Sequence, residues 1–217
     1  MHIADGVMAP EVWIAGWVIA LIGLALMFWR MGKKLDERTM PMMAILAAGI
    51  FVAQMLNFPI GGGTTGHLIG AALATILLGP YAAMLIITAI LTIQCLVFGD
   101  GGVTALGLNI LNMAIVAPLV TYGIMMLFGA KNRTAATPVA AWASVFLAAT
   151  VCAAELAISY SISGGAYGIT GALAFPAMMG YHALIGIGEA AVTTGVVLFL
   201  SKVSPEMLNL NTKPAEA

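Results

Sequence analysis

The 217-residue sequence contains very little charge. Asp, Glu, Lys and Arg together make up 8% of the chain, and the formal net charge is −1. Hydrophobic residues make up 62%, which is more than a water-soluble domain of this length needs for its core. The composition therefore excludes a soluble globular protein and predicts a polytopic membrane protein.

Cysteine and histidine are scarce as well. The two cysteines, Cys95 and Cys152, lie in apolar runs without the spacing of a metal site, so we expect them to be packing residues. The chain has only three histidines, His2, His67 and His182. It also lacks the basic start and the small-residue cleavage site of a secretory signal, so the first apolar run is expected to be a retained span.

Apolar runs long enough to cross about 30 Å of hydrocarbon predict the fold class. The third and fourth runs are short and are separated only by Gly79 and Pro80. We expect an all-α integral membrane protein with seven transmembrane helices in a single membrane domain, residues 1–217. The predicted spans are 11–30, 41–58, 67–80, 81–98, 104–128, 138–161 and 175–201.

The basic residues predict the orientation of these spans. All eight fall on one side of the seven-span arrangement: Arg30, Lys33, Lys34, Arg38, Lys131, Arg133, Lys202 and Lys213. Because Lys and Arg favour cytoplasmic loops, we expect an external amino terminus and a cytoplasmic tail at 203–217. The predicted outer side then holds Met1, His2, Asp5, the glycine-rich loop 59–66, the turn 99–102 and the loop 163–168.

A histidine in second place can turn the amino terminus into a metal chelator. The Met1 amine, the His2 backbone nitrogen and His2 Nδ1 close two fused rings on one ion when the amide gives up its proton. Three nitrogens in a plane suit Ni(II) or Cu(II). The alternative is a terminus that frays and binds nothing. The scarcity of histidine favours a metal-binding segment at 1–10, and the large His2 side chain favours retention of Met1, because aminopeptidases prefer a small second residue.

His67 is the candidate for the fourth ligand. It follows Thr64, Thr65 and Gly66 and opens the third predicted span, so we expect it in the first turn of a helix at the outer mouth. The helix dipole there disfavours added positive charge and keeps the imidazole neutral and available to a metal. The alternative is a histidine that hydrogen-bonds an interfacial loop. The predicted metal ligands are Met1, His2 and His67.

Other motifs carry less weight. Gly61, Gly63 and Gly66 have the spacing of a nucleotide-binding loop, yet they follow a membrane span and lack the required neighbours, so we exclude that function. Glu155, His182 and Glu189 lie inside predicted spans, where ionisable groups are costly. They predict a proton relay or a second metal site, or else partners that fix helix packing, and we favour packing.

The opening Met1-His2-Ile3-Ala4-Asp5-Gly6-Val7 resembles the amino-terminal signature of the CbiM/NikM family. These proteins are the substrate-specific components of energy-coupling-factor (ECF) nickel and cobalt transporters, and the likeness extends over essentially the whole chain. The resemblance implies that Met1, His2 and His67 hold one divalent ion near the outer face. It also implies a prokaryotic plasma-membrane location and three kinds of partner: a transmembrane coupling subunit, two cytoplasmic ATPase subunits and a small accessory membrane protein.

Alternative functions remain. A proton-driven secondary transporter calls for carboxylates along its path and recognisable halves; we see no internal repeat, and only Glu155 and Glu189 lie well inside. A membrane enzyme calls for a general acid and base near one pocket. We expect a transporter subunit rather than an enzyme, with nickel as the bound substrate because planar amide ligation favours low-spin d⁸ Ni(II), and with cobalt import for cobalamin synthesis as the alternative.

Overall fold

A computed structural model describes residues 1–31, 39–61, 63–129 and 132–209. Several basic residues that predict sidedness lie outside these ranges, as does the end of the predicted tail: Lys33, Lys34, Arg38, Lys131 and Lys213. The helices are α1 Pro10–Met31, α2 Thr39–Met55, α3 Ala71–Leu78, α4 Pro80–Ile93, α5 Leu106–Asn109, α6 Ala117–Phe128, α7 Arg133–Ile162 and α8 Gly171–Val203. Two π-helical stretches, η1 Gln94–Phe98 and η2 Ile110–Val116, continue α4 and join α5 to α6, and a short 3₁₀ turn, η4, covers Pro205–Asn209.

Five helical stretches of the described chain are long and apolar enough to cross a membrane. They are Pro10–Met31, Pro80–Phe98, Leu106–Phe128, Arg133–Ile162 and Gly171–Val203. Helix α2 is apolar but has 17 residues, and α3 has eight, which is a length of about 12 Å. The prediction of a multi-pass membrane protein is confirmed. The count of seven spans and the orientation of the termini stay predictions.

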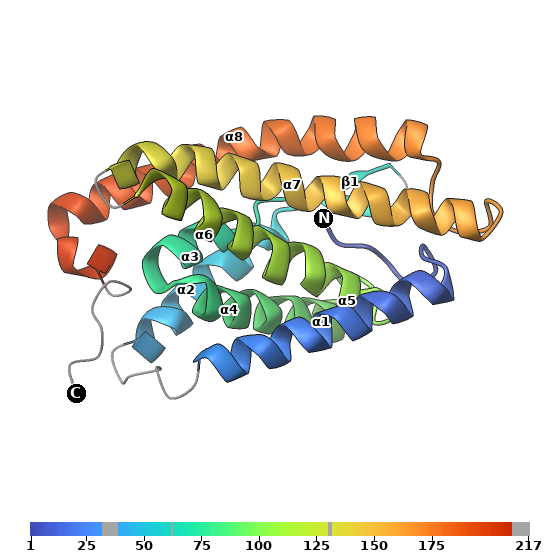
Figure 1. The fold of residues 1–217 in the computed structure, drawn as a ribbon, viewed down its shortest axis with the longest axis horizontal. Coiled ribbons are helices and arrows are strands. Elements are labelled where there is room, and N and C mark those ends of the chain that lie inside the picture. The colour runs from blue at the N-terminus through green and yellow to red at the C-terminus, as the bar shows by residue number, and fades with distance from the viewer. Residues whose placement is uncertain (32–38, 62, 130–131, 210–217) are drawn as a thin grey trace.

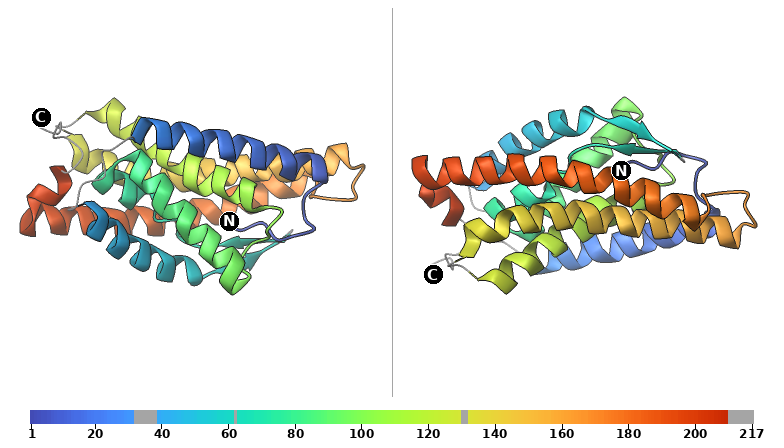
Figure 2. Two further views of the ribbon diagram at one scale, coloured as in Figure 1. Left: turned by 90° about the horizontal axis from the view of Figure 1, so that it is seen from below. Right: turned by 90° about the horizontal axis from the view of Figure 1, so that it is seen from above.

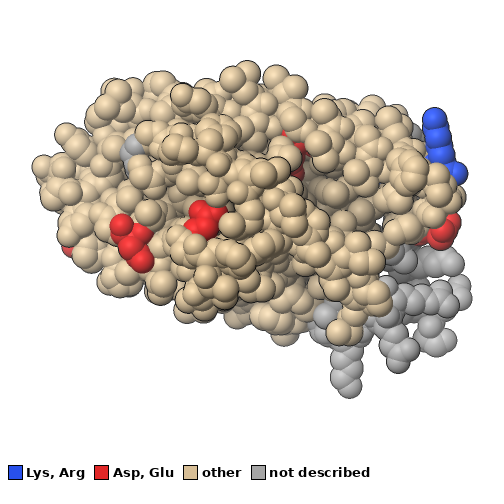
Figure 3. Space-filling model, turned by 180° about the vertical axis from the view of Figure 1, so that it is seen from behind, with Lys and Arg blue, Asp and Glu red and all other residues tan. Residues whose placement is uncertain are grey.

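The long helices lie roughly along one axis (Figure 1). Helices α7 and α8 pack against each other along much of their length, and α1 lies on another side of the bundle (Figures 1 and 2). Large apolar side chains such as Leu21, Trp29 and Leu184 are exposed on the long helices. In the face that Figure 3 shows, Lys and Arg atoms lie at one end and most of the surface between the ends is uncharged. A lipid-facing surface has this character.

The amino-terminal segment, residues 1–9, enters the helix bundle. The N marker lies within the outline of the bundle in all three ribbon views, not at one of its ends (Figures 1 and 2). Met1 and Ile3 are fully buried, and Ile3 forms an isolated antiparallel bridge with Thr64. The first residue of the chain is therefore part of the core.

The glycine-rich loop forms a small hairpin, which is the departure from the all-α prediction. Strand β1, Phe58–Ile60, pairs with β2, Thr64–Gly66, in antiparallel register, so that Ile60 faces Thr64. Residues 67–70 follow in a non-helical conformation before α3 begins. Gly70 has φ +74°, and a Cβ there would lie 2.7 Å from the Ile50 side chain. A glycine is required at this position for both reasons.

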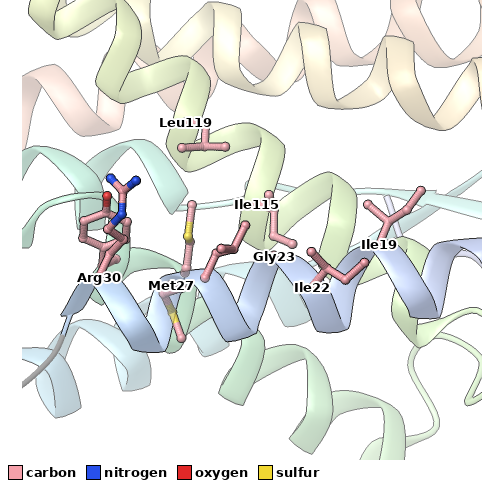
Figure 4. Close-up of a pocket in the computed structure, with 10 residues that line it drawn as sticks. Ile19, Ile22, Gly23, Met27, Arg30, Ile115 and Leu119 are labelled. Carbon is pink, nitrogen blue, oxygen red and sulfur yellow. The ribbon is translucent and has the colours of Figure 1, made fainter.

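An apolar pocket of about 400 Å³ lies beside α1 (Figure 4). Gly23 of α1 faces Ile115 of η2 there, and its Cβ position would lie 2.6 Å from Ile115 Cδ1. None of the residues that line the pocket is a predicted metal ligand. It therefore has no part in the site described next.

Candidate metal site

The structure brings Met1, His2 and His67 together in the interior. The imidazole rings of His2 and His67 stack with centroids 4.5 Å apart and an interplanar angle of 26°. The exposed fraction is 0% for Met1 and 2% for each histidine. The residues predicted as ligands from two distant segments are thus buried and lie next to one another.

His67 does not lie in the first turn of a helix. It follows strand β2 directly, and α3 begins four residues later, at Ala71. The predicted direction of the shift in its pKa holds, but the predicted cause, a helix dipole, is wrong. The pKa of His67 is lowered well below its usual value by burial first, and then by the charge of the amino terminus and of His2.

The tautomer of His67 follows from its one hydrogen bond. Its Nδ1 lies 2.8 Å from the backbone oxygen of Leu68, and because a carbonyl only accepts, Nδ1 carries the proton. Nε2 is buried and has no hydrogen-bond partner among the described residues. A neutral imidazole with this tautomer presents a buried lone pair on Nε2, which is the form that binds a metal.

The amino terminus is also uncharged at neutral pH. Burial lowers the pKa of the Met1 amine to about 4, although Cys152 and Asp100 act in the opposite direction. Burial, followed by the charge of the terminal amine, lowers the pKa of His2 well below its usual value. The Met1 amine and the two imidazoles therefore all present unprotonated nitrogens without the help of a metal.

One hydroxyl gathers the first two residues. Thr65 Oγ1 accepts hydrogen bonds from the Met1 amine, at 3.3 Å, and from the His2 backbone N–H, at 3.1 Å. These are two of the nitrogens that the sequence predicts as ligands. Both nitrogens direct an N–H toward Thr65 Oγ1, and this hydroxyl therefore holds the backbone of the terminus in place.

Backbone contacts with Asn109 and Gly102 set the register of the segment. Asn109 Oδ1 accepts the Ile3 N–H at 2.9 Å, and Asn109 Nδ2 donates to the Ile3 carbonyl at 3.2 Å. Gly102 N–H donates to the same carbonyl at 2.8 Å. Asp5 accepts hydrogen bonds from Val103 and Thr104. A shift of the terminus by one residue would break all these contacts.

A second set of contacts holds the segment that carries His67. Glu189 accepts the backbone N–H groups of Ile69, at 2.9 Å, and Gly70, at 2.7 Å. Gln54 Nε2 donates to the Ile69 carbonyl at 2.7 Å. Glu189 therefore has the packing role that we favoured, but its partner is backbone and not another side chain.

The other two ionisable groups of the predicted spans have separate partners. Glu155 accepts a hydrogen bond from Asn112 Nδ2 at 2.7 Å, as the packing prediction requires. His182 Nδ1 lies 2.7 Å from the Met178 carbonyl, while its Nε2 is buried without a partner among the described residues. His182 is close enough to contribute to the lowered pKa of His67, so all three histidines lie in one region.

The donor set is unusual for a protein metal site. In the described chain, no group of three or more His, Cys, Asp and Glu side chains is placed to hold an ion. The nitrogens predicted as ligands, which lie in one buried region, are one amine, one backbone amide and two imidazoles. Sequence reasoning missed Thr65, Asn109 and Gln54, whose roles depend on contacts between segments far apart in the chain.

Comparisons with known proteins show the family of the chain. The family model for the cobalt uptake substrate-specific transmembrane region, CbiM, matches residues 2–207. The chain is 41% identical over 216 residues to a putative fused nickel transport protein NikMN of Archaeoglobus fulgidus, covering 100% of this chain and 70% of that protein. It is 40% identical over 208 residues to a putative metal transport protein of Haloquadratum walsbyi, covering 96% and 93%.

A solved structure has the same fold. The crystal structure of a truncated transition metal transporter superposes with a TM-score of 0.88 at 37% identity, covering 94% of this chain and 99% of that one. The helix arrangement in Figures 1 and 2 is thus that of a known membrane transporter.

Proposed function

Because the chain belongs to the CbiM family of nickel and cobalt uptake proteins, we propose that it is the metal-binding component of an ATP-driven nickel importer of the ECF type. It is a multi-pass protein of the prokaryotic plasma membrane and a transport protein rather than an enzyme. The observation that carries the proposal is the convergence of the Met1 amine, the His2 backbone and the stacked rings of His2 and His67 in a buried site.

The proposed ligands are the Met1 amine, the deprotonated His2 amide, His2 Nδ1 and His67 Nε2. The first three close fused five- and six-membered chelate rings, which forces them into a plane. The free Nε2 of His67 supports its place as the fourth donor. A Met1 amine whose pKa is about 4 supports binding at neutral pH, because the ion does not compete with a proton there.

Nickel is the proposed substrate. Four nitrogens in a plane, one of them an amide anion, give a strong ligand field that stabilises low-spin Ni(II), and the general affinity order places Ni(II) above Co(II). Cobalt uptake is the alternative, because the description of the family model names cobalt, whereas the name of the archaeal relative names nickel. Competition between the two ions for the purified protein distinguishes them.

A proton-coupled secondary transporter is the second alternative. Its proton path would need carboxylates that are available to change partners. Glu189 holds the backbone of the segment that carries His67, and Glu155 is hydrogen-bonded to Asn112. Both carboxylates have packing roles in the described structure, which favours the ATP-driven importer.

Transport in this proposal needs further subunits. We propose an external amino terminus, a cytoplasmic carboxyl terminus and seven crossings. The partners are a transmembrane coupling subunit, two cytoplasmic ATPase subunits and a small accessory membrane protein. The archaeal relative, which is named as a fusion and of which this chain matches 70%, supports the presence of an additional component.

Nickel uptake tests the proposal directly. Cells that produce this chain with the coupling and ATPase subunits should accumulate nickel, and an ATPase variant that cannot hydrolyse ATP should abolish the uptake. A protonophore, with ATP levels maintained, should leave it intact. Uptake that survives loss of ATP hydrolysis and stops with the protonophore would contradict the proposal and favour the secondary transporter.

His67 and His182 form a matched pair for the site. His67→Ala removes the proposed fourth donor, so nickel binding to the purified protein should weaken by orders of magnitude. His182→Ala removes an equally buried imidazole by the same truncation, and it should bind nickel nearly as well as the parent. If the two variants exchange these results in a nickel titration, the site lies deeper in the bundle than proposed.

A further inference from the structure

Asp100 lies beside the proposed ligand His2. It belongs to the turn between η1 and α5, and its Oδ2 lies 3.6 Å from His2 Nε2. Its side chain is only 14% exposed. Asn57 Nδ2 donates a hydrogen bond to the same carboxylate oxygen at 2.6 Å. The carboxylate is thus held from one side by the residue just before strand β1 and faces the imidazole on the other.

We propose that Asp100 is a positioning residue that fixes the tautomer and orientation of His2, an inference that rests on the proposed function. Only His2 Nδ1 can close the six-membered chelate ring with the His2 amide nitrogen. A carboxylate at Nε2 keeps the ring proton there and leaves the lone pair on Nδ1. Histidines that bind metals commonly donate their other N–H to such a carboxylate, which orients the ring and makes it a better ligand.

The distance between His2 Nε2 and Asp100 Oδ2 defines their contact in the described structure. At 3.6 Å the atoms are within ion-pair range but beyond hydrogen-bond distance. A hydrogen bond from His2 Nε2 to Asp100 requires the two atoms to approach by about 0.5 Å. Asn57 holds the same Oδ2 that faces His2, so this carboxylate oxygen is fixed beside the imidazole.

Charge gives the carboxylate a second effect on the bound ion. A divalent metal with one amide anion and neutral amine and imidazole donors carries a net charge of +1. A charge of this kind inside a protein is costly unless it is paired. Asp100 also raises the pKa of the Met1 amine through its charge. Its carboxylate therefore acts electrostatically on both Met1 and His2.

The glycines around Asp100 allow this turn to close on the terminus. Gly101 has φ +88°, and a Cβ there would lie 3.3 Å from His2 Nδ1. A Cβ on Gly102 would lie 2.2 Å from the backbone nitrogen of Asp5. Since Gly102 N–H also donates to the Ile3 carbonyl, the turn and the terminal segment are in register. Asp100 is therefore placed at His2 by the backbone and not by a flexible side chain alone.

The other described carboxylates near the site have different partners. Asp5 accepts hydrogen bonds from Val103 and Thr104, and Glu155 accepts one from Asn112. Glu189 holds the backbone of Ile69 and Gly70. Among the described residues, Asp100 is the carboxylate that lies within 4 Å of the imidazole of a proposed ligand.

Nickel titration of the Asp100→Asn variant tests the inference, with native amino termini throughout. The variant keeps the shape of the side chain and loses its charge, so we expect nickel affinity to fall about 10- to 100-fold. The visible spectrum of bound nickel should change, because the His2 ring is no longer held. Glu11→Gln is the matched control: it removes an exposed negative charge at the start of α1, and both affinity and spectrum should remain those of the parent.

Asp100→Glu separates positioning from folding. It restores the carboxylate one methylene further out, and we expect it to recover part of the lost affinity and the parent spectrum. Parental affinity and spectrum in Asp100→Asn would overturn the inference, as would an equal loss in Glu11→Gln or the absence of any recovery in Asp100→Glu. If Asp100→Asn is parental while His67→Ala has lost nickel, the positioning role fails and the proposed function stands. If neither variant loses nickel, the proposed function fails as well.

Discussion

Burial of the donor nitrogens predicts how many protons nickel displaces. The perturbation is addition of Ni(II) to the metal-free protein at pH 7. The pKa of the Met1 amine is about 4, and the pKa values of His2 and His67 are well below 6.5. All three groups are therefore already deprotonated at pH 7. The only proton left for the ion to displace is the one on the His2 amide.

The magnitude differs clearly from that of an exposed terminus. With ordinary pKa values near 8 and 6.5, the amine would carry about 0.9 proton at pH 7 and each imidazole about 0.24. Nickel would then release about 2.4 protons, including the one from the amide. The buried site should release about one, and its apparent nickel affinity should rise about tenfold for each pH unit between pH 6 and 7.

Isothermal titration calorimetry in buffers of different ionisation enthalpy measures this number. The slope of the observed heat against the buffer enthalpy gives the protons released per nickel. A peptide that begins with the first seven residues of the chain serves as the exposed control, and because it lacks His67 it should release about 2.1 protons. Release of two or more protons by the protein would refute the reasoning, because it would mean that the terminus carries its proton in the metal-free state. Release of none would refute amide ligation.

Three further predictions concern the scaffold. Asn109→Ala leaves the buried N–H of Ile3 without its acceptor, at a cost of about 1–3 kcal/mol, while the Ile3 carbonyl keeps its hydrogen bond from Gly102 N–H. A nickel titration should show weaker binding to this variant, whereas Asn132→Ala, which removes an exposed hydrogen bond at 3.3 Å, should bind like the parent. The Met1 amine by itself should destabilise the metal-free protein by about 2 kcal/mol between pH 8 and pH 6, because the unfolded amine takes up a proton that the buried one, with a pKa of about 4, does not. Denaturant titrations of the native and the amino-terminally acetylated protein measure this contribution as the difference in their pH dependence, and the same pH dependence in both would argue against a buried neutral amine. A tag in the loop at 163–168 should be accessible from outside the cell and a reporter after residue 214 should be cytoplasmic, and the reverse result would invert the proposed topology.

The sequence predicted the long helices well because each is a continuous apolar run. The runs at 11–30 and 81–98 correspond to Pro10–Met31 and Pro80–Phe98, and the break at Gly79 and Pro80 is real, with Gly79 at φ +87°. The run at 67–80 failed for a physical reason. Contacts from Gln54 and Glu189 to the backbone hold 67–70 out of the helix, and no local pattern reports contacts from α2 and α8.

In the candidate site, too, some features could be predicted from the sequence and others could not. Met1, His2 and His67 could be predicted to meet because histidine is scarce and a chelating terminus needs one more donor. The cause of the low pKa of His67 could not, because burial is a property of the folded bundle. Asn109 and Asp100 also escaped prediction: each meets the terminal segment across about 100 residues of sequence, a separation over which a single sequence carries no pairing signal.

Extension of the amino terminus tests the central claim most directly. Two residues placed before Met1 convert its amine into a peptide amide and leave every native side chain unchanged. They also have to enter a site where Met1 is fully buried. Nickel content should be measured for the extended protein, for the native protein and for the extended protein after a protease has cut directly before Met1, all with the same carboxyl-terminal tag. Loss of nickel on extension and its return after cleavage are the predicted results, and equal nickel content in all three samples would contradict the chelating terminus.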